Sequence, residues 1–513
     1  MIASEPGLSD FRSLVARRLG LWFDDHRKDF LAGVLRDRIA NCDVEQTAYL
    51  QMLAGSGSRD EWQALAGLLT VTETYFLRGR DHFRAFIEMV LPDRLRQQPV
   101  ARPLRLLSAG CASGEEAYSL AIFLREHRAA LNGRPVEIVG VDINRHVLAK
   151  ARAGRYSEWA LRETPPGIRQ KYFRPVRSEF VLDESIVAMV SFQERNLVEP
   201  NDDLWQPGGF DAVFCRNMLM YFVPETAAAV VDRIQRALAP GGYLFLGHAE
   251  TLRGLSQAFH LRRDSGTFYY QLREGNEPLH PAVAIPRRES PPFEAAPEFA
   301  LAGGPVAATT WMDEIGRASA RIATLAAATP KPTVTVAMAA PPPKAGEINR
   351  VLDLHQQERF TEALAHLQGL PAGAAPDADL QVLQAMLLVN CGRLAEAEAL
   401  CRPLLGRDEL NAGVHYVAAL CREHAGDIAA TEEHDAAAAY LDPSFAMPRF
   451  HLGRVCKRLG RAPDALAHFE AALALLVKED PVRLLLFGGG FSRETLVQAC
   501  RSEIQRLLHQ APC

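Results

Sequence analysis

Two spacings of hydrophobic residues divide the chain. Over residues 8–80 apolar side chains recur every three or four positions, with polar residues between them. This spacing is typical of amphipathic helices, so we predict a small helical bundle. From residue 103 onward, short continuous apolar runs alternate with amphipathic stretches. Parallel strands have such runs because both faces of their sheet are covered. The region therefore predicts a doubly wound α/β domain.

The first apolar run of this domain, residues 104–107, leads through a small-residue turn into a helix that begins with Glu115 and Glu116. The turn is neither a GxGxxG dinucleotide motif nor a phosphate-binding loop ending in Gly-Lys-Ser/Thr. Two carboxylates also stand where a phosphate would contact the helix amides. This pattern favours a ligand with a cationic centre and no phosphate, such as S-adenosylmethionine. Glutamates in a first turn also commonly do no more than complement the helix dipole.

Polar residues follow the carboxyl ends of the later strands. We expect strands over residues 136–144, 190–198, 210–222 and 243–250, and a final edge strand over 267–272. Ligands of a doubly wound sheet bind at these ends, and an acidic residue after the second strand can bind ribose hydroxyls. The residues at the ends are Asp142, Asn196, Leu197, Arg216, Asn217 and Tyr221.

A short segment ahead of the first strand, VTETYFLRGRDHF at residues 71–83, combines aromatic and basic residues. Its aromatics are suited to an adenine or methionine slot, and the planar fork of Arg78 to a carboxylate. The alternative is a linker that packs Tyr75 and Phe76 into a domain junction. The segment alone favours neither interpretation.

Two regions fit neither hydrophobic pattern. Residues 155–192 contain short extended runs and a Pro-Pro turn, so we expect an inserted subdomain with a small antiparallel sheet. Residues 273–345 hold twelve of the 32 prolines. This composition does not bury enough surface to offset the entropy of ordering, which predicts a linker. Within it, Trp311–Leu325 is a candidate transient helix or docking motif.

The C-terminal part has an internal repeat. Glu358-Arg359, Gly392-Arg393, Gly426-Asp427 and Gly460-Arg461 stand 34 residues apart, and a small residue follows five positions after each pair. A period of 34 indicates tetratricopeptide helix pairs, which bind proteins. The predicted domains are a helical domain (1–80), an α/β domain (81–272), a Pro/Ala-rich linker (273–345) and repeats with a capping helix (346–513).

Composition narrows the class of protein. The 513 residues exceed one ordinary domain, and the net charge of −5 gives no reason to expect nucleic acid. The N-terminus has no apolar leader, and no apolar stretch of about 18 residues predicts a membrane span. The nine cysteines lack metal-ligand spacing, so we expect a cytoplasmic protein with reduced thiols and no metal site.

Five motifs in one order, TETYFLR, SAGCASGEE, VDIN, CRNMLMYF and GGYLFLGHAE, carry a resemblance. Over residues 1 to about 272 the chain resembles the CheR-type chemotaxis-receptor glutamate O-methyltransferases. Members with a Pro-rich linker and tetratricopeptide repeats, including those of surface-sensing and biofilm pathways, are similar over the full length. The resemblance implies a class I methyltransferase fold with an inserted β-subdomain. It also implies methyl transfer from S-adenosyl-L-methionine to glutamates on the cytoplasmic domain of a chemoreceptor.

The resemblance also implies roles for single residues. It assigns cofactor contacts to Thr74 and Arg78. It also assigns one to Glu115, the acidic residue after the glycine loop, and one to Asp142, the ribose ligand. It places a tyrosine, Tyr221, near the transferring methyl group. Thr72 stands where the family usually has Asn, and Leu77 replaces a customary Phe. The cofactor-binding positions are Thr72, Thr74, Arg78, Glu115, Asp142, Asn196, Leu197, Arg216 and Asn217.

Two other functions stay open at this stage. One is a methyltransferase that acts on a small molecule or RNA, although the chain lacks the basic-aromatic stripe of an RNA-binding protein. The other is an inactive scaffold that displays the repeats. The repeats themselves are expected to bind a receptor, another signalling protein or the catalytic domain.

Overall fold

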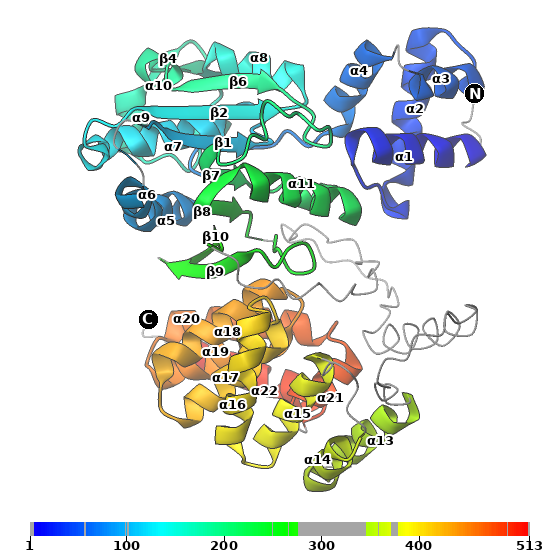
Figure 1. The fold of residues 1–513 in the computed structure, drawn as a ribbon, viewed down its shortest axis with the longest axis vertical. Helices are drawn as coiled ribbons and strands as arrows, with labels where there is room; N and C mark the ends of the chain where they lie inside the picture. The colour runs from blue at the N-terminus through cyan, green and yellow to red at the C-terminus, as the bar shows by residue number, and fades with distance from the viewer. Residues whose placement is uncertain are drawn as a thin grey trace, which may run out of the picture. The chain divides into compact units, whose positions relative to one another are not determined.

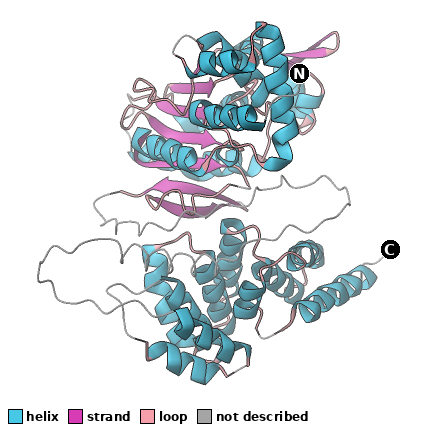
Figure 2. Cartoon of the chain, turned by 90° about the vertical axis from the view of Figure 1, so that its right-hand side faces the viewer, coloured by secondary structure: helices cyan, strands magenta, loops and turns pink. Residues whose placement is uncertain are grey.

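The computed structural model describes residues 5–274 and 345–510, apart from 56–57, 98, 100–101, 249, 265, 358, 371–377 and 490. The chain divides into two compact units, Met1–Leu279 and His280–Cys513 (Figure 1). Most of the predicted linker, with its candidate segment Trp311–Leu325, lies outside the described residues. Figure 2 shows strands in the first unit, whereas the described secondary-structure elements of the second unit are all helices.

The first unit begins with the predicted helices. They are α1 (Glu5–Leu19), η1 (Asp25–Arg27), α2 (Lys28–Cys42), α3 (Gln46–Ala54) and α4 (Arg59–Leu69). The apolar stripes converge in one core, in which Phe11, Leu35 and Leu65 are fully buried. Tyr221 and Phe222, which come from the α/β part, pack against this core.

The short segment between α1 and η1 pairs with the α/β part through its backbone. Leu21 pairs with Phe222 in an antiparallel bridge. The amide of Trp22 donates to the carbonyl of Tyr221 at 2.7 Å, and the amide of Val223 donates to the carbonyl of Gly20 at 2.8 Å. The loop that carries Tyr221 is therefore held by backbone hydrogen bonds with the segment that follows α1.

Seven strands form the main sheet in the order β6-β2-β1-β7-β8-β10-β9. The first five in this order are parallel, and β10 pairs antiparallel with both β8 and β9. The strands are β1 (Leu104–Ala109), β2 (Val136–Asp142), β6 (Val190–Glu194), β7 (Phe210–Cys215), β8 (Leu238–Leu246), β9 (Phe259–Asp264) and β10 (Thr267–Leu272). This order confirms the doubly wound prediction.

The helices of the α/β part are α5 (Arg80–Ala85), η2 (Phe86–Val90), α6 (Leu91–Gln97), α7 (Glu115–Glu126), η3 (Arg128–Leu131), α8 (Arg145–Ala153), η5 (Leu219–Tyr221) and α11 (Pro224–Ala237). The prediction of residues 267–272 as the edge strand was wrong, because β10 lies between β8 and β9. The edge strand β9 is mostly polar and only partly buried, so it lacks the apolar run that marks the other strands.

A three-stranded antiparallel sheet is inserted between α8 and β6. It consists of β3 (Arg155–Tyr156), β4 (Phe173–Val176) and β5 (Glu179–Leu182), with η4 (Trp159–Leu161), α9 (Pro166–Tyr172) and α10 (Glu184–Val187). Val190 already pairs with Ile138 in the main sheet. The predicted insert, residues 155–192, therefore extends three residues into β6.

The second unit is built of helix pairs. They are α13 (Ala345–Gln356) with α14 (Phe360–Gln368), α15 (Ala378–Asn390) with α16 (Leu394–Arg407), α17 (Ala412–His424) with α18 (Ile428–Leu441), and α19 (Ala446–Arg458) with α20 (Ala462–Leu476). Two further helices follow, α21 (Pro481–Phe487) and α22 (Arg493–Gln510). No helix in the described part of the chain is long and apolar enough to cross a membrane.

The repeat spacing has a structural cause in the turns. Gly392, Gly426 and Gly460 have φ angles of 73°, 79° and 73°, which a side chain disfavours. Each ends the first helix of a pair and lets the second begin two residues later. A Cβ on Gly453 in α19 would lie 2.9 Å from the ring of Phe469 in α20. Only glycine therefore lets α19 and α20 approach so closely. The helix pairs confirm the tetratricopeptide prediction.

Candidate active site

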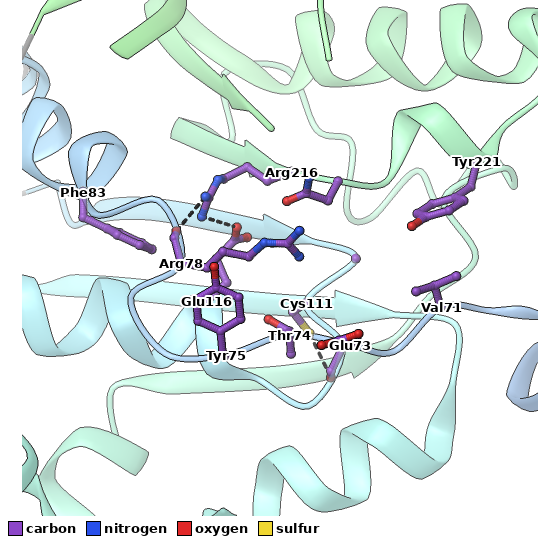
Figure 3. Close-up of a pocket in the computed structure, with 13 residues that line it drawn as sticks. Val71, Glu73, Thr74, Tyr75, Arg78, Phe83, Cys111, Glu116, Arg216 and Tyr221 are labelled. Carbon is purple, nitrogen blue, oxygen red and sulfur yellow. Dashed lines mark hydrogen bonds and ion pairs between the residues drawn. The ribbon is translucent and has the colours of Figure 1, made fainter. Parts of the chain in front are cut away.

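A pocket in the first unit lies at the carboxyl ends of β1 and β7 (Figure 3). One wall is the segment 71–78, and the others come from the turn after β1, the start of α7 and the loop after β7. This is the edge at which doubly wound sheets bind ligands. The lining residues are Val71, Glu73, Thr74, Tyr75, Arg78, Phe83, Gly110, Cys111, Ala112, Glu116, Arg216, Asn217 and Tyr221.

The turn after β1 brings backbone to the pocket. A Cβ on Gly110 (φ 73°) would lie 2.7 Å from the sulfur of Met218, so this position requires glycine. The amide of Ala112 donates to Oδ2 of Asp142 at 2.9 Å, and the amide of Asn144 donates to Oδ1 at 2.8 Å. Burial raises the pKa of Asp142, and the backbone donors oppose that shift. The acid at the end of β2 is thereby fixed beside the turn.

Arg216 joins three walls of the pocket. Its Nη1 lies 3.2 Å from Oε2 of Glu116, and its Nη2 donates to the carbonyl oxygen of Arg78 at 2.6 Å (Figure 3). Its guanidinium also lies 5.5 Å from the ring centre of Phe83. Burial lowers the pKa of Arg216 and raises that of Glu116, which opposes charge on both groups. Arg216 therefore holds β7, α7 and the segment 71–78 together.

A buried carboxylate, Glu250, shapes the loop after β7. Its Oε2 accepts hydrogen bonds from the amides of Asn217 (2.6 Å) and Gly247 (2.8 Å). Its Oε1 accepts from the amides of Met218 (2.8 Å) and Met220 (3.3 Å). Asn217 has a φ of 56°, a strained conformation that this network holds in place. No role was predicted for Glu250, although it ends the GGYLFLGHAE motif.

Among the polar groups of the pocket, the guanidinium of Arg78 and the hydroxyl of Tyr221 form no hydrogen bond or ion pair with the described residues. Figure 3 shows that both point into the space between the walls. The Arg78 guanidinium lies 5.6 Å from the ring centre of Tyr75. A cation and a hydroxyl that face an open space are suited to a ligand with a carboxylate.

The segment 71–78 contributes one aromatic residue to the pocket and another to the junction with the inserted sheet. Tyr75 lines the pocket, and the guanidinium of Arg162 lies 3.8 Å from its ring centre. Phe76 is fully buried against Tyr156 and Phe173, with ring centres 4.7 and 4.8 Å away. Phe76 therefore packs at the domain junction, whereas a contact of Tyr75 with adenine or methionine stays a prediction.

The structure brings together half of the site residues expected from the sequence. Thr74, Arg78, Arg216, Asn217 and Tyr221 line the pocket, whereas Thr72, Glu115, Asp142, Asn196 and Leu197 do not. The amide nitrogen of Asn196 donates to the carbonyl of Arg18 at 2.9 Å, and the carbonyl of Leu197 accepts from Arg233 at 3.2 Å. Their cofactor contacts stay predictions. Tyr75 and Glu116 also line the pocket, and both belong to patterns from which a ligand site was predicted. The lining residues for which no role was predicted are Val71, Glu73, Phe83, Gly110, Cys111 and Ala112.

Glu115 gives a prediction on pH. It is 3% exposed, Ser113 Oγ donates to its carboxylate, and burial raises its pKa to about 7. An unfolded glutamate ionises near 4.5, so the folded state loses stability as the pH rises from about 4.5 to 7. Glu115→Gln removes this loss. We therefore expect the free energy of unfolding of the variant, relative to that of wild type, to be about 1–3 kcal/mol higher at pH 8 than at pH 5. Urea unfolding of the first unit at both pH values measures it.

The matched control for this pH effect is Glu184→Gln, at an exposed position in the first turn of α10. Its stability difference from wild type should be the same at pH 5 and pH 8. A Glu115→Gln difference that is equally independent of pH would show that the carboxyl of Glu115 ionises normally in the folded protein.

The sheet order, the glycine turn after β1 and the acid after β2 together define a class I S-adenosylmethionine-dependent methyltransferase. The profile of the family described as CheR methyltransferase, SAM binding domain, matches residues 72–266. Chemotaxis protein methyltransferase 2 of Vibrio cholerae is 32% identical over 279 residues, which are 54% of this chain and 96% of that protein. The chain therefore belongs to the CheR methyltransferase family.

A longer relative extends the similarity into the second unit. The probable biofilm formation methyltransferase WspC of Pseudomonas aeruginosa is 30% identical over 414 residues, 73% of this chain and 96% of that protein. The chemotaxis protein methyltransferase of Salmonella typhimurium is 33% identical over 254 residues, 48% of this chain and 85% of that protein. These comparisons confirm the resemblance read from the motifs and the S-adenosylmethionine cofactor.

Proposed function

We propose that this chain transfers a methyl group from S-adenosylmethionine to glutamate side chains of a chemoreceptor cytoplasmic domain. The product is a glutamate methyl ester. The observation that carries the proposal is the pocket at the ends of β1 and β7, with the unpaired side chains of Arg78 and Tyr221 facing one space. The names of the relatives, chemotaxis and biofilm methyltransferases, support the substrate class.

The residues of the pocket suit the cofactor. Arg78 places on one wall a guanidinium that has no ion-pair partner within the described residues, and it is suited to the carboxylate of the methionine end. Asp142 stands at the end of β2, where a ribose is bound in related sheets. Gly110, Cys111 and Ala112 bring the turn after β1 to the pocket wall. Thr74 and Asn217 add polar groups to the same walls.

The reaction needs no general base. A glutamate side chain has a pKa near 4.3, so the acceptor is already an anion at neutral pH. Bound S-adenosylmethionine supplies an electrophilic methyl group on a sulfonium. In this proposal the hydroxyl of Tyr221 donates a hydrogen bond that orients the acceptor carboxylate. The walls that Arg216 and Glu250 hold in place align the reactants and exclude water, which is where the rate enhancement arises.

Methylation of a purified chemoreceptor cytoplasmic domain tests this function. With radiolabelled cofactor, we expect label in the receptor that mild base releases as methanol, and modified glutamates in its mass spectrum. Base-stable label would indicate a different acceptor. Absence of cofactor binding by calorimetry would indicate an inactive scaffold.

Arg78→Ala should weaken cofactor binding. Loss of a charge-assisted hydrogen bond to a carboxylate costs about 1.5–3 kcal/mol, which is roughly a 10–100-fold higher Kd. Calorimetric titration with S-adenosylmethionine measures it. The control is Arg80→Ala, at an exposed position that does not line the pocket, and it should leave the Kd unchanged. An unchanged Kd in Arg78→Ala would remove this residue from the cofactor site.

Tyr221→Phe should lower the methylation rate and leave cofactor affinity nearly unchanged. A hydrogen bond of about 0.5–1.5 kcal/mol corresponds to a roughly 2–10-fold slower reaction. The measurements are single-turnover methylation of the receptor domain and calorimetric binding of the cofactor. Wild-type turnover would exclude the hydroxyl from the reaction, and a large loss of cofactor affinity would move it to the cofactor site.

A further inference from the structure

The short helix α21 covers one face of the helical unit, and stacked helix pairs bind other proteins through extended surfaces of this kind. The first helices of the four pairs are α13, α15, α17 and α19, and we call the surface they share the first-helix face. Helix α21 comes after the last pair, yet it lies against α13 and α15 (Figure 1). The chain therefore turns back from its end to its beginning across this face.

Apolar side chains fix α21 to the first-helix face. Leu484, Leu486 and Phe487 are 6%, 2% and 6% exposed. The ring of Phe487 lies 5.8 Å from that of Tyr416 in α17 and 5.0 Å from that of Phe445 at the start of α19. Close backbone approach in α17 makes room for this ring, because a Cβ on Gly413 would lie 3.3 Å from it.

A cation at the start of α21 enters an acidic site. The Nη1 of Arg483 donates to Oδ2 of Asp442 at 2.7 Å, and its Nη2 donates to the carbonyl of Ser444 at 2.9 Å. Arg483 also pairs with Glu479, whose other carboxylate oxygen accepts from the amide of Ala446 at 2.6 Å. The face thus binds one cation followed by a row of leucine and phenylalanine side chains.

The chain segments immediately before and after α21 contact each other directly, without help from α21. The guanidinium of Arg493 donates to the carbonyls of Leu476 and Val477, both at 2.8 Å, and to that of Glu479 at 2.6 Å. Helix α22, which begins with Arg493, packs on α20. The chain therefore leaves and returns at one place, as in an Ω-loop. A glycine turn at 488–489, with φ of 64° at Gly489, follows α21.

We propose that α21 is an internal occupant of a partner-binding face. The partner presents a short helical segment of the same chemistry, an arginine followed within four residues by leucine and phenylalanine side chains. It replaces α21 while α20, α22 and the acidic pair Asp442 and Glu479 stay in place. Release of α21 alone would expose Tyr416 and Phe445, which are 3% and 2% exposed, so only an apolar replacement keeps the face covered. This inference does not depend on the methyltransferase reaction.

Peptide binding to the full chain tests the proposal. The probe is a fluorescent peptide with the sequence of residues 481–489. The variant carries a Gly/Ser segment of equal length in place of residues 481–488. We expect the peptide to bind this variant at least tenfold more tightly than wild type. Arg483→Glu or Phe487→Ala in the peptide should each weaken binding at least fivefold, whereas Leu485→Ala, at a half-buried position, should have little effect.

Equal binding to both proteins, or binding to neither, would overturn the proposal. Hydrogen exchange on the wild-type chain gives a second test that does not require the variant to fold. The amides of residues 482–487 should exchange at least tenfold faster than the central amides of α20 and α22, because the segment detaches separately. Equal protection would show that α21 is a permanent part of the helical core and would also overturn the proposal.

Discussion

Arg216→Met is expected to lower the free energy of unfolding of the first unit by about 3–5 kcal/mol, because it leaves the carboxylate of Glu116 buried without its partner. The side chains of this pair are 3% and 14% exposed. The substitution also deprives the carbonyl of Arg78 of its donor. The pocket wall should loosen, so cofactor affinity should fall together with stability. Calorimetric unfolding and cofactor titration measure the two effects.

A double-mutant cycle separates the pair from its surroundings. Arg216→Met with Glu116→Gln removes both charges and should recover part of the lost stability, since neither buried charge remains unpaired. The matched control is Arg236→Met, whose exposed ion pair with Asp232 should contribute less than about 1 kcal/mol. Equal losses for Arg216→Met and Arg236→Met would show that the buried pair has no special role.

Glu250→Gln is expected to destabilise the first unit by about 2–4 kcal/mol. The glutamine side chain keeps one acceptor oxygen, and its amino group would face two backbone N–H donors that now bind the second carboxylate oxygen. Each buried donor left without an acceptor costs about 1–3 kcal/mol. The strained conformation of Asn217 loses its support, so cofactor affinity should also fall. Thermal unfolding and calorimetric binding are the measurements.

The comparison for Glu250→Gln is Glu184→Gln, the same substitution at an exposed site, which should change stability by less than about 0.5 kcal/mol. A small effect of Glu250→Gln would mean that the loop holds its shape without the carboxylate. In that case the positions of Asn217 and Tyr221 would depend on the contacts of Tyr221 and Phe222 with the N-terminal helices.

Features encoded by local pattern could be predicted from the sequence. The apolar runs located β1, β2 and β7, and the 34-residue period located the helix pairs, because both report burial that repeats along the chain. Strand β9 was missed because its side chains are mainly polar at the sheet edge. Its neighbour β10 was then taken for the edge strand.

Within the site, the sequence identified residues but not their orientations. Arg216 was expected to contact the cofactor, yet its guanidinium is bound to Glu116 and to the backbone of Arg78. Which of two adjacent glutamates lines the pocket depends on the helical phase of α7, and the structure places Glu116 there. Glu250 binds amides some 30 residues away in the chain, a relation that no local pattern contains.

The bridge between Leu21 and Phe222 bears on how this protein can be divided. A fragment that starts at residue 72, where the family profile begins, would lack the backbone groups of Gly20 and Trp22 that flank Tyr221. Such a truncated enzyme would retain its glycine turn and the acid at the end of β2, and lose the backbone anchor of Tyr221. Minimal catalytic fragments of this chain therefore need to include the N-terminal helices.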